Sequence, residues 1–81
     1  MENIVNVKVT GPIGSEIEIR TRPTIKIQKM IDAYAQEKNL DPNVLKMINS
    51  EGTHMSRDKT LADYDVEDGD MFSIVMEQHG G

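Results

Sequence analysis

The fold of this chain is decided by residues 24–40, which read TIKIQKMIDAYAQEKNL. Four apolar side chains in this stretch recur at intervals of three and four residues, the spacing of one face of an α-helix: Ile27, Met30, Ile31 and Tyr34. We expect Thr24 to cap the first turn. We expect Asn39 to end the helix, because asparagine tolerates the left-handed conformation that stops helices. Such a helix needs an apolar surface to cover its apolar face.

The residues before the helix predict a β-hairpin. Residues 5–9, VNVKV, alternate valine with polar side chains, and residues 16–20, EIEIR, alternate isoleucine with charged ones. Alternation with period two is typical of a strand with one buried face. Residues 10–15 between them hold two glycines and a proline, which favours a turn. The two strands are therefore expected to pair antiparallel.

Further strands follow the helix. A third strand is predicted around residues 45–48 and is broken by Gly52, and a short fourth is expected near Met55. Residues 60–63, TLAD, are typical of one capped helical turn. The last strand, residues 71–76, follows an Asp-Gly turn signal. Its alternation puts three side chains on one face: Phe72, Ile74 and Met76.

Together these elements predict an α+β fold. The order is ββαββ with a helical turn inserted, and the helix can bury its apolar face only against one face of a mixed sheet. The first and last strands are expected to be adjacent and parallel at the centre, because the helix supplies the crossover that a parallel pair needs. This arrangement is a β-grasp. We expect it over residues 1–76, with residues 77–81 as a flexible tail.

Composition restricts the classes of function. Eighty-one residues make one small domain, and with 37% hydrophobic residues its core is too small for an ordinary enclosed catalytic cleft. The absence of cysteine excludes disulfides, cysteine-based zinc sites and a thiol nucleophile, and His54 and His79 lack metal-site spacing. No apolar run approaches the ~18 residues of a membrane span. We therefore expect a soluble intracellular domain with no enzyme activity, catalytic residue, cofactor, metal or membrane contact.

Charge is distributed unevenly along the chain. The net charge is −5, and residues 51–81 hold two Lys or Arg against eight Asp or Glu. Four cations nevertheless fall within ten residues of the first half: Arg20, Arg22, Lys26 and Lys29. Four cations without interleaved aromatic residues do not indicate a nucleic-acid surface. Taken alone, this cluster can equally be a solvated charged face.

The last five residues, EQHGG, suggest a handle for other proteins. A diglycine has no side chains, so it can enter a slot too narrow for a Cβ and present a terminal carboxylate inside another protein's active site. A free carboxylate does not react with amines, so a partner enzyme must first convert it to an acyl adenylate and pass it to a thiol. The alternative interpretation is a linker remnant.

These features jointly resemble the ubiquitin-like proteins, and among them the small ubiquitin-like modifier (SUMO) family. The resemblance covers residues 4–81 and rests on six segments in order: Lys8–Gly11, Ser15–Ile17, Met30–Tyr34, the Thr60 segment, Glu67–Asp70 and the EQHGG ending. It implies ATP-dependent activation at Gly81, preceded by Gly80, in a monomeric mature form found in nucleus and cytoplasm. The implied partners are an activating enzyme, a conjugating enzyme, ligases, substrate lysines and a deconjugating protease.

The resemblance also implies two noncovalent contact sites. The first is a groove between the second strand and the helix that binds SUMO-interacting peptide motifs as an added strand. Its floor would be Ile17, Ile19, Thr21 and Met30, and its rim Arg20, Arg22, Lys26 and Lys29. The second is a contact for the conjugating enzyme at Glu51, Gly52 and Asp70. The alternatives are that the apolar residues are simply core and the acidic ones a solvated face.

Three departures from the family pattern accompany these expectations. The turn at residues 49–52 is one residue longer and has Asn49 in place of an aromatic residue, Glu37 occupies a position that is often basic, and His79 precedes the diglycine. No lysine lies in the hydrophobic-Lys-x-acidic arrangement, which argues against polymeric chains. Two other functions remain open. One is a β-grasp sulfur carrier with a terminal thiocarboxylate, and the other is a noncovalent SUMO-like domain of a larger protein.

Overall fold

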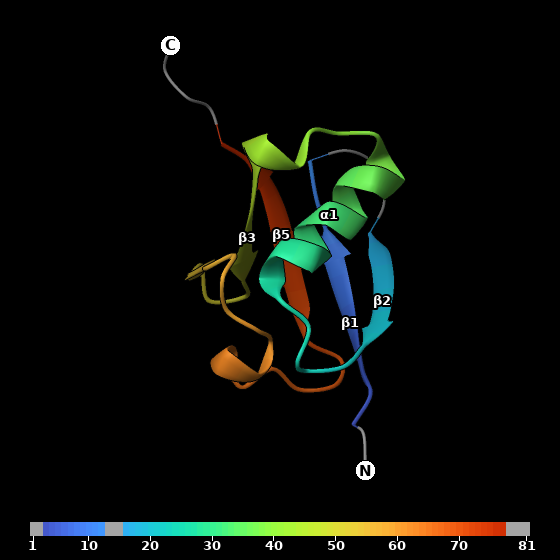
Figure 1. The fold of residues 1–81 in the computed structure, drawn as a ribbon, viewed down its shortest axis with the longest axis vertical. Helices are drawn as coiled ribbons and strands as arrows, with labels where there is room; N and C mark the ends of the chain where they lie inside the picture. The colour runs from blue at the N-terminus through green and yellow to red at the C-terminus, as the bar shows by residue number, and fades with distance from the viewer. Residues whose placement is uncertain (1–2, 13–15, 78–81) are drawn as a thin grey trace.

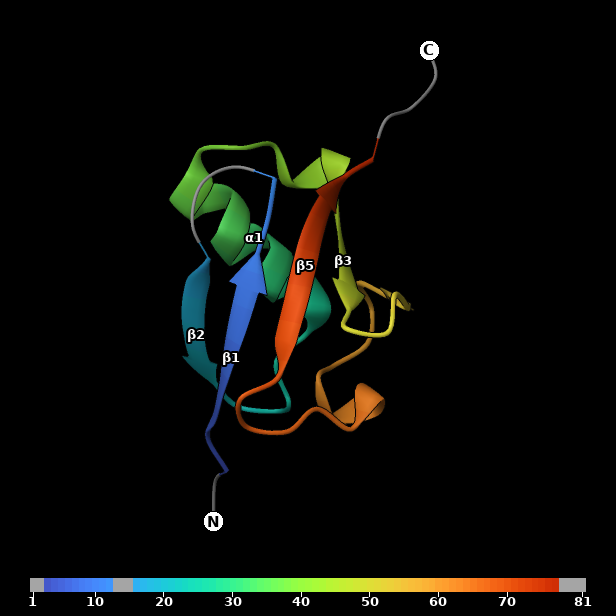
Figure 2. The ribbon, with the colours of Figure 1, turned by 180° about the vertical axis from the view of Figure 1, so that it is seen from behind.

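The computed structural model describes residues 3–12 and 16–77, and the predicted β-grasp is confirmed in it (Figure 1). Five strands form one mixed sheet in the order β2-β1-β5-β3-β4, and helix α1 crosses one face of it. Figure 2, from behind, shows the other face uncovered by any helix. The elements are β1 Val5–Thr10, β2 Ile17–Thr21, α1 Ile27–Lys38, η1 Pro42–Val44, β3 Leu45–Asn49, β4 His54–Met55, η2 Ala62–Tyr64 and β5 Met71–Met76.

The predicted hairpin pairs in a single register. β1 and β2 are antiparallel, with Val7 opposite Ile19 and Val9 opposite Ile17. The alternating valines of β1 are buried, whereas Lys8 between them is exposed, as the period of two predicts. Part of the predicted 10–15 turn, residues 13–15, lies outside the described residues.

The centre of the sheet is the parallel pair that the sequence predicts. β5 lies beside β1 in parallel, with Val9 opposite Phe72, and beside β3 in antiparallel, with Met47 opposite Ile74. β4 has two residues and pairs with the end of β3. The sheet therefore has a five-residue strand, β2, at one edge and a two-residue strand at the other.

The start of α1 differs from the prediction. Thr24 does not cap it: the N-cap is Lys26, which makes no side-chain cap bond. The first helical N–H groups instead donate to backbone carbonyls of a distant loop, Ile27 to Lys59 at 2.8 Å and Gln28 to Arg57 at 3.2 Å. These bonds satisfy backbone N–H groups that the side chain of an N-cap residue would otherwise satisfy. A tertiary contact therefore replaces the expected local cap.

The end of α1 is as predicted. Asn39 adopts the left-handed conformation, with φ 60° and ψ 46°. The N–H of Leu40 donates to the carbonyl of Ala35 at 2.8 Å, which closes the last turn. The next turn is fixed by Asp41, whose side chain accepts from the N–H of Asn43 at 2.9 Å before η1.

One apolar core lies between helix and sheet. Within residues 3–12 and 16–77 it contains fourteen buried side chains, among them all four of the predicted helix stripe. Phe72 and Ile74 are buried as expected, but Met76 is 50% exposed although it shares their face. Met76 is the last residue of β5, where the chain leaves the core. The alternation therefore predicted its direction correctly but not its burial.

The segment between β4 and β5 is held by polar contacts within itself and with β1. The Thr60 N–H donates to Oδ2 of Asp63 at 2.8 Å, and the Asp63 N–H donates to Oγ1 of Thr60 at 3.3 Å, which is the predicted capped turn. Further on, Oδ1 of Asp68 accepts the backbone N–H of Asn6 at 2.7 Å. Gly69, at φ 91°, completes the predicted turn into β5.

Candidate functional site

The edge of the sheet at β2 is the first candidate site. β2 is the terminal strand of the sheet, with β1 as its neighbour, so alternate N–H and C=O groups along it face outward. Ile17 and Ile19 lie opposite buried valines of β1, and residues directly opposite share a face of the sheet. Both isoleucines are half-buried and pack against the core. The edge therefore combines unpaired backbone groups with a partly accessible apolar side.

The other predicted groove residues on β2 and α1 fall on different sides. Thr21 lies opposite Val5, so it shares the helix side with the two isoleucines. Arg20 lies opposite Asn6, so it is on the uncovered face, where it is exposed. Met30 has 0% exposed surface and belongs to the core. The structure therefore places Met30 in the core, where it could not form the floor of the predicted groove.

The four predicted cations come from two parts of the fold. Arg20 and Arg22 lie on β2 and just after it, and both are exposed. Lys26 and Lys29 are the N-cap and a first-turn residue of α1, and they are exposed as well. Figures 1 and 2 show the start of α1 near β5, whereas its other end extends toward β2. The basic cluster is thus two pairs on separate elements.

Two of the three residues predicted to contact the conjugating enzyme line a hollow in the surface. Glu51 and Asp70, nineteen positions apart in the chain, both line a hollow of about 430 Å³. Its apolar lining includes Met71 and Phe72 of β5. Gly52, the third predicted residue, lies in the adjoining loop at φ 84° with open space around it. The structure therefore brings two of these three residues to one depression with acidic walls.

Asn49 organises this loop, a role that we did not predict from the sequence. Its Oδ1 accepts the backbone N–H groups of Glu51 and Thr53, each at 2.9 Å. Its carbonyl oxygen accepts the N–H of Gly52 at 3.0 Å. A signal was present, because asparagine followed by Ser-Glu-Gly is typical of a side-chain-closed turn. The unusual residue in the family pattern thus has a structural use.

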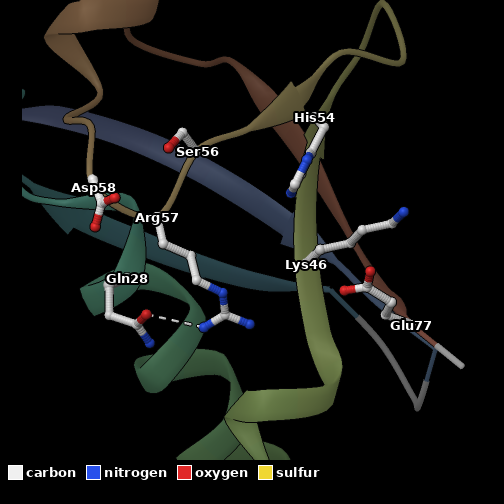
Figure 3. A pocket seen from close by; sticks show the side chains of 7 residues that line it. All are labelled: Gln28, Lys46, His54, Ser56, Arg57, Asp58 and Glu77. Carbon is white, nitrogen blue, oxygen red and sulfur yellow. Dashed lines mark hydrogen bonds between the residues drawn. The ribbon is translucent and has the colours of Figure 1, made fainter. Parts of the chain in front are cut away.

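A second hollow of about 430 Å³ lies beside Arg57, which no motif singled out (Figure 3). The Arg57 Nη1 donates to Oε1 of Gln28 on α1 at 3.0 Å. Its Nη2 donates to the carbonyl of Pro42 at 2.8 Å and to that of Leu45 on β3. The remaining lining residues carry mixed charge: Lys46, His54, Ser56, Asp58 and Glu77. The contacts of Arg57 therefore join α1, η1 and β3.

The acidic segment also contains a carboxyl group with a shifted pKa. The pKa of Asp63 is lowered from the usual carboxylate range, chiefly because the backbone N–H of Thr60 donates to the ionised group. The Thr60 side chain and then the charge of Lys59 lower this pKa further. Asp63 is exposed, so the effect belongs to the capped turn and not to a buried site.

The end of the chain is the remaining candidate. β5 ends at Met76, and the N–H of Glu77 donates to the carbonyl of Val44 at 2.7 Å. The predicted conjugation residues, Gly80 and Gly81, lie outside the described residues.

The described residues contain neither a grouping suited to a metal ion nor a helix suited to a membrane. Within residues 3–12 and 16–77, no group of three or more His, Asp or Glu is placed to hold a metal ion. No helix in this part of the chain is both long and apolar enough to cross a membrane.

Comparison with a family model gives one match along nearly the whole chain. The model described as "Ubiquitin-2 like Rad60 SUMO-like" matches residues 5–76.

Several curated proteins are similar in sequence. "Ubiquitin-like protein pmt3/smt3" of Schizosaccharomyces pombe is 31% identical over 77 residues, which cover 95% of this chain and 65% of that protein. "Small ubiquitin-related modifier 2" of Arabidopsis thaliana is 27% identical over 77 residues, covering 95% and 74%. "Ubiquitin-like protein NEDD8" of Dictyostelium discoideum is 32% identical over 75 residues, covering 93% and 96%. The chain thus spans just under two thirds of the fission-yeast relative.

Solved structures match in fold. The ubiquitin of Caldiarchaeum subterraneum superimposes with a TM-score of 0.85 at 22% identity, covering 98% of this chain and all of that one. The ubiquitin-like domain of Plasmodium falciparum Dsk2 gives 0.83 at 20% identity, covering 93% and 100%. At these identities the likeness concerns the ubiquitin-like fold alone.

Proposed function

The chain belongs to the SUMO-like family of ubiquitin-like proteins, and we propose that it is a protein modifier, activated at Gly81 and attached by an isopeptide bond to lysines of other proteins. As a member of this family it is not an enzyme. The observation that supports the proposal most is the family match over residues 5–76, directly followed by a segment that reads EQHGG. The chemistry therefore belongs to partner enzymes.

The proposed reaction takes the Gly81 carboxyl group through an acyl adenylate and thioesters to an isopeptide bond. The Gly81 carboxylate attacks ATP, forming an acyl adenylate and releasing pyrophosphate, and an enzyme thiol then displaces AMP to form a thioester. After transfer to the conjugating enzyme, a lysine amine attacks the thioester carbonyl and the thiol leaves. Two residues without side chains let this carbonyl reach a confined site. Ligases would assist the last step, and a protease would hydrolyse the isopeptide bond.

We also propose that β2 receives peptide motifs as an added strand. Outward backbone groups of β2 would provide the ladder bonds, and the helix-side isoleucines, Ile17 and Ile19, would contact apolar peptide side chains. Arg20 and Arg22 would attract acidic residues of the peptide. The hollow that Glu51 and Asp70 line is the surface we propose for the conjugating enzyme. Action in the nucleus and cytoplasm stays a prediction.

A charging assay tests the proposed function. The chain is incubated with ATP and a SUMO-type activating enzyme, and we expect an adduct that a reducing thiol removes. Deletion of Gly80 and Gly81 should abolish this adduct and leave the thermal unfolding midpoint unchanged, because the elements described end at Met76. An activating enzyme without its catalytic cysteine is the control.

Two results would contradict the proposal. The first is an adduct that still forms with the truncated chain, and the second is a full-length chain that no ubiquitin-like activating enzyme charges. A terminal thiocarboxylate on protein isolated from its host would favour the sulfur carrier instead.

A further inference from the structure

The edge strand β2 has a charge pattern that is complementary to itself. Residues 16–22 read EIEIRTR, so acidic residues precede the central Ile19 and basic residues follow it at the same intervals. Although the family resemblance implies a monomer, we propose that β2 pairs antiparallel with β2 of a second copy of this chain, about a two-fold axis at Ile19. The two five-stranded sheets then become one continuous sheet. This inference does not rest on the proposed function.

The pairing brings opposite charges together twice. About an axis at Ile19, Glu18 lies directly opposite Arg20 of the second copy, and symmetry repeats the pair. Both residues are exposed. Just outside the strand, Glu16 lies opposite Arg22 of the second copy. Oppositely charged side chains directly across an antiparallel ladder stabilise the pairing.

The register within one copy shows that these side chains lie on one face. Glu18 lies opposite Lys8 of β1, and Arg20 lies opposite Asn6, so both are on the uncovered face of the sheet. Ile19 lies opposite the buried Val7 and therefore on the helix side. The axis then places the Ile19 side chains of the two copies beside each other on that side. Charged and apolar contacts are thus separated on the two faces of the joint.

The backbone of β2 has room for a partner strand. The strand is terminal in the sheet, and Figures 1 and 2 both show no described element beyond it. Its five residues allow about four to six ladder hydrogen bonds with a second strand. The other edge strand, β4, has only two residues and offers less.

The same pattern disfavours the other pairings. A parallel, in-register pair would set glutamate against glutamate and arginine against arginine. An antiparallel pair shifted by two residues would place Glu18 opposite Glu18 of the second copy, or Arg20 opposite Arg20 of the second copy. A shift by one would place charged residues on the apolar face. The antiparallel register about Ile19 pairs both charged residues of the strand, Glu18 and Arg20, and its symmetry closes after two chains instead of building an open stack.

A regulatory consequence follows for the peptide site. Self-pairing occupies the same outward groups of β2 that an added peptide strand would use. Binding of a peptide and formation of the pair therefore exclude each other. Because the charge pairs are exposed, salt should weaken the self-association.

Sedimentation equilibrium of the full chain over a wide concentration range tests the inference. We expect a monomer–dimer equilibrium that weakens at high salt. Arg20→Glu sets glutamate against Glu18 twice and should raise the dimer dissociation constant about tenfold, and Glu18→Arg should act similarly. Lys46→Glu, the same charge change on β3, is the matched control and should have little effect.

Mixing the two variants gives the sharpest readout. In a mixed pair, the E18R chain has a cation at both positions 18 and 20, and the R20E chain has a carboxylate at both. Every cross-strand pair then joins opposite charges, so the mixture should dimerise at least as well as the wild type. The double variant E18R/R20E should also regain self-association. Thermal unfolding of each variant confirms that it is folded, and the mixture reports complementarity even if one variant is less stable.

The inference is overturned by any of three results. One is a chain that stays monomeric at every concentration. This holds also if the chain binds a Val/Ile-rich peptide at β2, because the strand edge would then bind peptides and not a second copy. Another is a dimer that R20E and K46E weaken equally. The third is an equimolar mixture of the E18R and R20E variants that associates no better than either alone.

Discussion

Gly11 is where a single side chain would disturb the core most directly. A Cβ at Gly11 would lie 1.9 Å from Oη of Tyr34, whose side chain is fully buried at the far end of the helix stripe. Because Tyr34 is enclosed, it cannot move aside without disturbing its neighbours. The absence of a side chain at residue 11 therefore lets the backbone of Gly11, just after β1, lie close to Tyr34 of α1.

We predict that Gly11→Ala lowers the free energy of unfolding by about 1–3 kcal/mol, the usual cost of forcing extra volume into a packed site. Urea denaturation followed by circular dichroism measures it. Thr24→Ala is the control, and it should change stability by less than about 0.5 kcal/mol, because Thr24 does not cap α1. An unchanged free energy of unfolding for Gly11→Ala, or a clear loss for Thr24→Ala, would contradict this prediction.

Asp63 makes the stability of the capped turn depend on pH. Its pKa is lowered in the folded state, mainly by the backbone N–H of Thr60, so the folded protein favours the ionised carboxylate. This contribution is complete above the ordinary pKa of about 3.8 and is lost as the pH falls through the lower folded value.

We predict that Asp63→Asn destabilises the protein at neutral pH and that the difference from the wild type shrinks as the pH falls below about 4. Thermal unfolding midpoints between pH 2 and pH 7 measure both curves. Asp58→Asn, at an exposed position five residues earlier, serves as the comparison. Parallel curves for wild type and Asp63→Asn over the whole range would show that the carboxylate has no such role.

Among the elements, Arg57 connects α1, η1 and β3. Its guanidinium donates to Gln28, to the Pro42 carbonyl and to the Leu45 carbonyl, so one side chain serves three segments. The fork of a guanidinium can reach such divergent acceptors, whereas an ammonium cannot do so with the same geometry.

We predict that Arg57→Met lowers the free energy of unfolding by about 1–3 kcal/mol, because two half-buried carbonyls lose their donor. Arg57→Lys should recover only part of this loss. Hydrogen exchange should show faster opening around β3 and the start of α1 than elsewhere. Lys59→Met, at an exposed neighbouring position, is the control. Equal losses of unfolding free energy for Arg57→Met and Lys59→Met would contradict this role of Arg57.

The elements that depend on local patterns could be predicted from the sequence. Alternating valines marked β1, the helix stripe marked α1, and Asn39 marked the helix end, because each signal acts within a few residues. The start of α1 was predicted wrongly, since Thr24 is a good local cap but the donors are taken by carbonyls of residues 57 and 59. Arg57 and the Gly11–Tyr34 contact gave no sequence signal, because both depend on segments that meet only in the folded chain.

At the scale of the whole molecule, the candidate site was predicted in part. The edge position of β2 follows from the predicted hairpin and the predicted central pair of the first and last strands. Glu51 and Asp70 were grouped by the family resemblance and not by the strand pattern, and both line one hollow. Met30 could not be placed correctly, because helical spacing shows that a side chain faces the sheet but not how deeply it is covered. Gly80 and Gly81 lie outside the described residues, so their role remains a prediction from the sequence and the family.

The central claim is that this chain becomes covalently attached to other proteins through Gly81. Mass spectrometry of proteins purified with a tagged form of the chain from its host tests this most directly. The account predicts branched peptides in which the Gly81 carbonyl is joined to the ε-amino group of a substrate lysine, and none with a chain that lacks Gly80 and Gly81. Recovery of the chain only in free form, or with sulfur in place of one terminal oxygen, would contradict it.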